Sequence, residues 1–312
     1  MLQVFVSIVI LVWLLHKTNW QALSTRFWKI SLPWFVVGLF AYAVNLSLSS
    51  LRWGVILRTV KRAAPASWLL RLIWVGAYFN QVLPGSVSGD VLRAWYTRGQ
   101  AGSATFALAI VFADRFIGMG SLVLIASGAV LLGGRHLAML PGIGETIAAL
   151  FLGYGVVVLL ILSPLLAPME RVLGKMGERL REIRLGMAKL LRHPPALILT
   201  LLLSLLVQLC SILQFWALAH ALGEELDPIA LWVVWPVVSL LLALPISLAG
   251  WGLREGLLVF YLGSLQMSHD QALALSLLMG FSVILTSLPG ALLWLGVSRH
   301  PWNAAEVQEA HR

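Results

Sequence analysis

The stretch LPGSVSGDVLR at residues 83–93 returns in altered form as LPISLAGWGLR at residues 244–254. The two stretches share the pattern L-P-x-S-x-x-G-x-x-L-R without a gap. Each holds a proline, which ends or breaks a helix, and glycines, which permit tight turns and close approach of two backbones. Each closes on an arginine. The recurrence of this pattern at two distant places predicts a duplicated structural unit.

The apolar runs around the two stretches recur at the same spacing. Shifting the chain by the offset from 83 to 244 superposes run 32–51 on 193–212, run 68–83 on 229–244, and run 104–132 on 265–293. Three crossings and one re-entrant hairpin in each half would insert the halves in opposite orientations, which is the inverted-repeat plan of many transporters. We therefore expect repeat halves at 1–145 and 146–297, against the alternative of a chance match in a chain rich in Leu and Gly.

The composition indicates a membrane protein. Of the 312 residues, 60% are hydrophobic and 11% are charged, whereas a soluble domain has about 45–50% apolar and about 25% charged residues. One crossing takes about 20 apolar residues, so the chain suits about six to eight transmembrane helices. We predict an all-α polytopic membrane protein, one membrane domain over 1–312, with two re-entrant Pro/Gly hairpins. No basic residue precedes the apolar core of 1–15, which favours a first membrane helix over a signal peptide.

The net charge of +9 lies largely in loops, where the positive-inside bias explains it without nucleic acid. Residues 168–193 combine basic residues with apolar ones at spacings of three and four, which predicts a basic amphipathic helix on the cytoplasmic leaflet. The acidic loop 223–228 fits the opposite side, and the tail 298–312 the cytoplasmic side. Arg52 and Arg93 are counted among the charges that face the cytoplasm.

The two repeated stretches are also the predicted binding site. A helix that restarts after a break offers free backbone N–H groups to an anion, and an arginine beside it adds full positive charge. The alternative is that the prolines and glycines serve packing and the arginines lie at the interface. The predicted substrate-binding residues are Asn80, Pro84, Gly85, Ser86, Gly89, Asp90, Arg93, Pro245, Ser247, Gly250, Trp251, Gly252, Arg254 and Glu255.

Asp114 and Arg115 interrupt the apolar run 104–132. They lie about ten residues inside it, or about 15 Å at 1.5 Å per residue, where an unpaired charge costs at least about 2.5–3.5 kcal/mol. Neighbours on a helix point about 100° apart, so each needs another partner, with Arg93, Asp90 and Glu255 as candidates. We predict an intramembrane charge network, with a purely structural ion pair as the alternative.

Residues 80–93, NQVLPGSVSGDVLR, resemble the N-x-x-L-P-G-S-x-G-G-D-x-x-R signature of the lysylphosphatidylglycerol synthase transmembrane family, also called flippase-like. Residues 249–256, AGWGLREG, resemble its second signature, G-G-W-G-x-R-E. Ser88 and Ala249 each replace a glycine by another small residue. The resemblance implies the translocation part of such proteins. Because the sequence stops at residue 312, we expect it without the soluble synthase domain of two-part members.

These observations and the resemblance together favour a lipid translocase of the bacterial inner membrane and not an enzyme. A lipid with an anionic, phosphate-bearing headgroup would lie between the two hairpins, held by Arg93 and Arg254. The single Cys210 and the scattered histidines give no disulfide or metal pattern, and we expect no cofactor. The alternatives are an intramembrane transferase acting on a polyprenyl-phosphate lipid, and a membrane scaffold for a soluble synthase or glycosyltransferase partner.

Overall fold

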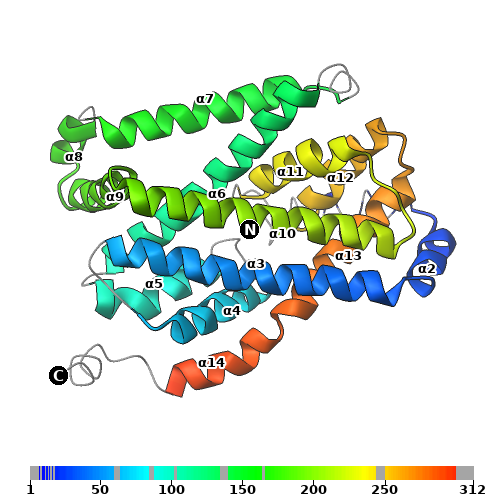
Figure 1. The fold of residues 1–312 in the computed structure, drawn as a ribbon, viewed down its shortest axis with the longest axis horizontal. Helices are drawn as coiled ribbons and strands as arrows, with labels where there is room; N and C mark the ends of the chain where they lie inside the picture. The colour runs from blue at the N-terminus through cyan, green and yellow to red at the C-terminus, as the bar shows by residue number, and fades with distance from the viewer. Residues whose placement is uncertain are drawn as a thin grey trace.

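The computed structural model describes residues 18–59, 64–83, 88–101, 104–133, 140–163, 166–243 and 250–299, together with Ser7, Val9, Ile10, Val12, Leu14 and His16. Every regular element in these residues is a helix, which confirms the all-α fold class (Figure 1). The helices are, in chain order, α2 (Trp20–Trp28), α3 (Leu32–Thr59), α4 (Ala66–Val82), α5 (Ser88–Ala101), α6 (Ala104–Gly133), α7 (Ile143–Leu162), α8 (Ala167–Val172), α9 (Lys175–Leu191), α10 (Pro194–Ala221), the π-helical turn η3 (Ala230–Val234), α11 (Trp235–Leu242), α12 (Leu253–Ser264), α13 (His269–Ser287) and α14 (Pro289–Arg299).

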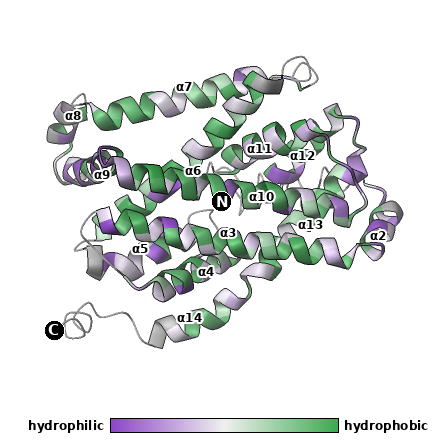
Figure 2. Ribbon diagram, in the orientation of Figure 1, coloured by the Kyte–Doolittle hydropathy of each residue, from purple (hydrophilic) through white to green (hydrophobic). Residues whose placement is uncertain are grey.

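Five helical segments in the described residues are long and apolar enough to cross a membrane. They are α3, α6, α7, α10, and α13 together with α14. In Figure 2, where the ribbon is coloured by residue hydropathy, these segments are largely green, whereas α2 and α9 show much of the hydrophilic purple. The expected six to eight included two Pro/Gly hairpins, so these five segments, together with the shorter helices α4, α5, α11 and α12, agree with it. Most of the run 1–15 lies outside the described residues. The chain is a multi-pass membrane protein.

Two pairs of short helices form hairpins instead of crossings. The 17 residues of α4 and the 14 of α5 reach about 26 and 21 Å at 1.5 Å per residue, less than the hydrocarbon core of about 30 Å. In Figure 1, α4 and α5 lie in one half of the molecule, and α11 and α12 lie in the other. The first hairpin connects to the neighbouring long helices at the end that carries α8 and α9, and the second at the end that carries α2. The two hairpins therefore connect to the long helices at opposite ends of the molecule, and their re-entry without crossing the membrane stays a prediction.

The offset from 83 to 244 relates the helices of the two halves in order. It carries α3 onto α10, α4 onto η3 with α11, α5 onto α12, and α6 onto α13 with the start of α14, and the ends differ by at most about four residues where one helix matches one helix. Figure 1 shows α3 and α10 side by side, and the Asn45 side chain of α3 donates a hydrogen bond to the Val207 carbonyl of α10 at 2.8 Å. The helix order thus follows the superposed apolar runs. The inverted relation of the two halves stays a prediction, as does the side that faces the cytoplasm.

The basic segment 168–193 is two helices, not the single helix that its pattern predicted. Gly174 adopts the positive φ of 53° between α8 and α9, which only glycine tolerates readily. The guanidinium of Arg184 on α9 binds both carboxylate oxygens of Glu170 on α8, at 2.6 and 3.2 Å. Near its end, α9 buries Met187 and Leu190 in the core. This part of the apolar face therefore packs on the protein and is not available to lipid.

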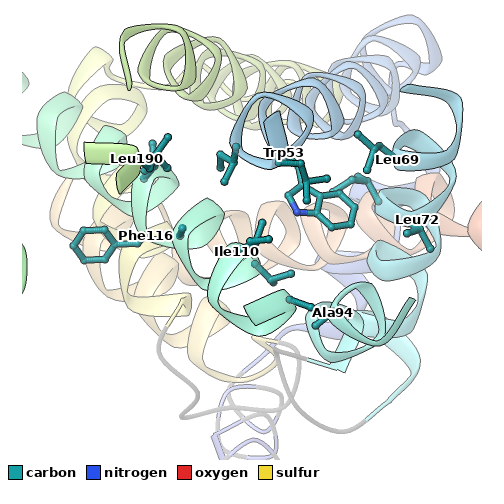
Figure 3. Packing of buried hydrophobic residues seen from close by; sticks show 14 of the residues in the cluster. Trp53, Leu69, Leu72, Ala94, Ile110, Phe116 and Leu190 are labelled. Atoms are coloured by element: carbon teal, nitrogen blue, oxygen red, sulfur yellow. The ribbon is translucent and has the colours of Figure 1, made fainter. Parts of the chain in front are cut away.

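The core of the first half surrounds Trp53, which is fully buried. In Figure 3, Leu69 and Leu72 of α4 lie on the same side of this cluster as Trp53, while Phe116 of α6 and Leu190 of α9 lie at its other side. A second cluster joins η3, α11, α12 and α13 to α10. Close packing of this kind has few voids and resists deformation, so it gives the polar side chains between the clusters fixed positions.

Pro289 separates α13 from α14, because proline lacks the N–H that would continue the helix. Beyond this bend, α14 packs against α4. A Cβ at Gly290 would overlap the Trp74 carbonyl and meet Tyr78. The last described helix of the second half thus supports the hairpin of the first.

Candidate functional site

Asn80 on α4 joins the two helices of the first hairpin by a hydrogen bond. Its side-chain Oδ1 accepts a hydrogen bond from the Gly89 N–H at 2.7 Å. Gly89 in turn lies so close to Gly76 of α4 that a Cβ at position 89 would overlap the Gly76 carbonyl. The two helices therefore meet backbone to backbone. Asn80 thus accepts from one of the N–H groups in the first turn of α5 that have no partner within the helix. The sequence analysis had predicted that these N–H groups bind an anion.

The second hairpin satisfies its helix start in a similar way. Gly250 and Gly252 have φ angles of 85° and 82°, which are strained for any residue with a side chain. The Gly252 N–H donates a hydrogen bond to Glu255 Oε2 at 2.6 Å. At both hairpins, then, a side chain of this protein caps the helix that follows the break.

Five charged side chains from three helices form one network in the first half. Arg52 Nε of α3 donates to Asp114 Oδ1 of α6 at 2.7 Å. Arg93 of α5 donates to Asp114 Oδ2 and to Asp90 Oδ1, both at 3.1 Å. Arg115 Nε of α6 donates to Asp90 Oδ2 at 2.7 Å. All four carboxylate oxygens thus accept from a guanidinium, and three arginines against two aspartates leave one positive charge in excess.

Arg52 and Arg93 are buried in this network, with 6% of each residue exposed. Arg52 also donates to Ser204 Oγ of α10 at 3.1 Å. The guanidinium of Arg93 lies 4.4 Å from the ring centroid of Trp53, a cation–π contact. Neither arginine is a loop charge that faces the cytoplasm, as the sequence had suggested, so neither bears on the orientation of the chain.

Arg115 differs from the other members of the network because 43% of its side chain is exposed. Its Nε is held by Asp90, while its two Nη atoms have no hydrogen-bond partner among the described residues. This guanidinium is therefore positioned at one edge and open at the other, as required of a group that binds a ligand anion.

Two neighbouring cavities open onto the network. The smaller, of about 190 Å³, includes Asn80, Asp90, Arg93 and Asp114 in its lining. The larger, of about 330 Å³, includes Gln208, Gln214, Trp235 and Arg254. Both are lined by Tyr42, Arg52, Gln81 and Arg115. Arg115 therefore faces both cavities, and the larger one reaches from the first half of the chain into the second.

The arginine of the second hairpin is neutralised by its neighbour in the chain. Arg254 Nη2 donates to Glu255 Oε1 at 2.6 Å, and Ser276 Oγ of α13 donates to the same oxygen at 3.1 Å. The Arg254 guanidinium lies 4.7 Å from the Trp251 ring centroid. A Cβ at Gly280 would overlap this guanidinium. Glu255 therefore belongs to this local pair and not to the network of Asp90 and Asp114.

The structure thus joins Asp90, Arg93, Asp114 and Arg115, with Asn80 in the wall of the same cavity. Arg93 and Arg254 line different cavities, so the expectation that they hold one headgroup together has no support in this arrangement. Five predicted site residues lie outside the described part of the chain: Pro84, Gly85, Ser86, Pro245 and Ser247.

Sequence reasoning missed several polar residues of the cavities. Arg52 was assigned to a loop, and Gln208 and Gln214 were passed over inside the apolar run that forms α10. Gln208 Nε2 donates to the Gly118 carbonyl at 3.3 Å, and Gln214 Nε2 donates to Ser282 Oγ at 3.0 Å. Polar residues inside a membrane helix usually face the protein interior or a water-filled cavity, and this signal was available in the sequence.

Comparison with known proteins gives a family but no characterised relative. No curated protein matches the chain, and no solved structure matches it. The family model described as "Lysylphosphatidylglycerol synthase TM region" matches residues 1–290, a range that includes both hairpins and the whole charge network. Its description associates the chain with membrane lipid modification or translocation. This chain belongs to the lysylphosphatidylglycerol synthase transmembrane-region family.

Proposed function

We propose that this protein moves a phosphate-bearing anionic lipid between the leaflets of the bacterial inner membrane. The headgroup enters the two neighbouring cavities, and its phosphate binds the open edge of Arg115. The lipid tails stay in the bilayer. Phosphate suits a guanidinium, which offers it two parallel N–H donors.

The observation that carries the proposal is the excess positive charge beside the cavities. Charged side chains within a membrane are costly and usually mark the path of a polar substrate or ion. Here the aspartates neutralise two of the three arginines, and the remaining charge is located where a guanidinium is exposed. A bound phosphate supplies the missing negative charge, which favours an anion over a neutral or cationic group at Arg115.

The same geometry favours transport over an intramembrane transferase. A transferase needs a carboxylate free to act as a general base or metal ligand. Both carboxylates lining the smaller cavity, Asp90 and Asp114, accept hydrogen bonds from arginines at each oxygen, so neither has an oxygen without a protein donor. Product formation from a polyprenyl-phosphate lipid that depends on a divalent metal would contradict this assignment.

The test is leaflet exchange in proteoliposomes. Purified protein is reconstituted with an acyl-labelled fluorescent phosphatidylglycerol, and a membrane-impermeant reductant bleaches the label in the outer leaflet. Full bleaching shows exchange, and protection of half the label shows none. We expect exchange above the rate of protein-free vesicles. We also expect a loss of at least about tenfold in Arg115→Gln, since a hydrogen bond to a charged group contributes about 1.5–3 kcal/mol.

Arg98→Gln is the matched control. Arg98 lies on α5, is exposed, and has its guanidinium 3.7 Å from the ring centroid of Trp95. Arg98→Gln removes one positive charge, as Arg115→Gln does, but at a residue that lines neither cavity. Equal loss in the two variants would remove Arg115 from the mechanism. No exchange in the unchanged protein, with either an imposed pH gradient or a membrane potential, would contradict the translocase function.

A further inference from the structure

The polar lining of the larger cavity consists of arginines and neutral groups, beside apolar side chains such as Met119, Leu122 and Met279, and no carboxylate lines it among the described residues. Its charged lining residues are Arg52, Arg115 and Arg254. The remaining polar lining consists of amides, hydroxyls and an indole, from Tyr42, Gln81, Gln208, Ser211, Gln214, Trp235 and Ser239. A lipid headgroup in this space therefore meets groups that suit an anion and groups that suit hydroxyls.

The positions and partners of the acidic residues explain why the larger cavity lacks negative charge. Residues 1–89 contain no Asp or Glu, and neither does the stretch 244–249. The carboxylates on α5, α6 and α12 are Asp90, Asp114 and Glu255. Both oxygens of Asp90 and of Asp114 accept from arginines. Glu255 is fully buried and accepts from Arg254 and from the Gly252 N–H. None of the three is left to neutralise an ammonium group.

The amides of the larger cavity, unlike these carboxylates, have acceptor oxygens that a ligand can use. Gln208 and Gln214 use Nε2 for hydrogen bonds within the protein, which leaves each Oε1 to accept from a ligand. An amide oxygen accepts a hydrogen bond from a hydroxyl but does not neutralise a cation. A site built to hydrogen-bond a hydroxylated headgroup discriminates strongly against groups that leave its polar atoms unpaired.

We propose that the lipid carried by this protein has an uncharged, hydroxyl-bearing headgroup on its phosphate, and that a cationic aminoacyl headgroup is rejected. The proposal rests on the translocase function and names its substrate class. Glycerol or sugar hydroxyls bind the amides and hydroxyls beyond Arg115. The two ammonium groups of a lysyl ester instead meet the one positive charge that the carboxylates leave in excess, on the exposed guanidinium of Arg115, and like charges brought together in this way oppose binding.

The experiment compares two acyl-labelled lipids in the same proteoliposomes, phosphatidylglycerol and its lysyl ester. We expect phosphatidylglycerol to exchange at least about tenfold faster, because like-charge juxtaposition costs several kcal/mol. Equal or faster exchange of the lysyl ester would overturn the substrate assignment and leave the translocase function standing. Exchange of neither lipid above protein-free vesicles would contradict the translocase function itself.

A gain-of-charge variant tests the reason for the selectivity. Gln214→Glu keeps the side-chain shape and places a carboxylate in the larger cavity, where the Ser282 hydroxyl can reorient to donate to it. We expect the ratio of phosphatidylglycerol to lysyl-ester exchange to fall at least about threefold, as electrostatic complementarity sets specificity. Gln21→Glu on the exposed face of α2 makes the same charge change away from the cavities and should leave the ratio unchanged. A ratio that falls equally in both variants would overturn the role given to the cavity.

Discussion

The two hairpins carry an arginine at matching positions but neutralise it in different ways. Arg93 reaches Asp90 on its own helix, Asp114 on α6 and the ring of Trp53 on α3. Arg254 binds Glu255, the next residue in the chain, and the ring of Trp251 just before α12. The first arrangement ties three helices together by charge, whereas most of the second lies within one short segment.

This difference follows residue by residue from the repeat. At the offset from 83 to 244, the first-half residues Arg52, Asp90, Asp114 and Arg115 correspond to Leu213, Trp251, Leu275 and Ser276. The second half has kept the helices and lost the network. A displacement of α5 therefore breaks ion pairs with α3 and α6, while α12 can shift with its arginine still neutralised. We infer that the second hairpin is the more readily displaced of the two.

Asp114→Leu, which introduces the residue found at the matching position 275, is expected to have the largest effect. It leaves Arg52 and Arg93 buried without a shared counter-ion, and breaking a buried pair costs about 3–5 kcal/mol. Thermal unfolding in detergent, followed by size-exclusion chromatography, measures the loss. The double variant Arg52→Leu/Asp114→Leu removes one charge of each sign and should recover part of it. A double variant less stable than Asp114→Leu would contradict the network as described.

Glu255→Gln is expected to have a smaller effect, about 1.5–3 kcal/mol, from weakened hydrogen bonds to one charged group. Glu255 is the counter-ion of Arg254 alone, whereas Asp114 is shared by Arg52 and Arg93. The same unfolding assay makes the comparison. Protection of α12 and α13 from hydrogen exchange should fall, while that of α5 and α6 should not. A loss spread over both halves would show that the second pair is not local.

Gly89→Ala tests the backbone contact in the first hairpin. The added methyl group overlaps the Gly76 carbonyl, and the shift that relieves such overpacking costs about 1–3 kcal/mol. Gly99→Ala on the same helix is the control, because a Cβ there meets nothing within 4 Å and alanine favours a helix by about 1 kcal/mol over glycine. Similar unfolding temperatures for the two variants would refute the close approach of α4 and α5.

Glu170→Gln, outside both hairpins, should have the smallest effect and one that depends on pH. The hydrogen bond from Arg184 lowers the pKa of Glu170 below its ordinary 4.5. A lowered folded pKa stabilises α8 and α9 fully above pH 4.5, and this stabilisation is lost as pH falls through the folded value. Unfolding temperatures measured from pH 3 to pH 7 should show this loss in the unchanged protein. Glu170→Gln should lack this loss of stability at low pH. If the variant and the unchanged protein showed the same pH profile, Glu170 would not be the cause of the loss.

Much of the fold could be predicted from the sequence, because long apolar runs and their breaks have few structural solutions in a bilayer. The helix breaks near Pro84 and Pro245 and the order of the helices follow from local sequence. The cost of burying charge gave Arg93, Asp90 and Glu255 as candidate partners of Asp114 and Arg115, and two of these three lie in the network. Each of these predictions needs only the properties of one segment, or a choice among a few charged residues as ion-pair partners.

The remaining features depend on distances between segments, which no single segment encodes. Arg52 ends an apolar run and resembles a loop charge, and only the approach of α6 and α10 gives it buried partners. The apolar spacing of three and four in residues 168–193 continues through Gly174, so the sequence predicted one helix. The turn at Gly174, which brings α9 back onto Glu170, was missed although a glycine is a common sign of such a turn. Likewise, the assignment of Arg93 and Arg254 to separate cavities follows from the depth of each hairpin and not from their matching motifs.

Arg52 also imposes an order on biosynthesis. Its partners Asp114 and Ser204 follow it by 62 and 152 residues in the chain. At about 5–20 residues per second, roughly 8–30 seconds pass between synthesis of α3 and synthesis of the α10 hydroxyl. Asp114 is made after roughly 3–12 seconds, so Arg52 lacks its carboxylate until then, and it lacks the Ser204 acceptor for the whole interval. We therefore expect α3 to remain beside the insertion machinery or at the aqueous interface until α6 arrives, so that the first half is assembled before α10 closes over it.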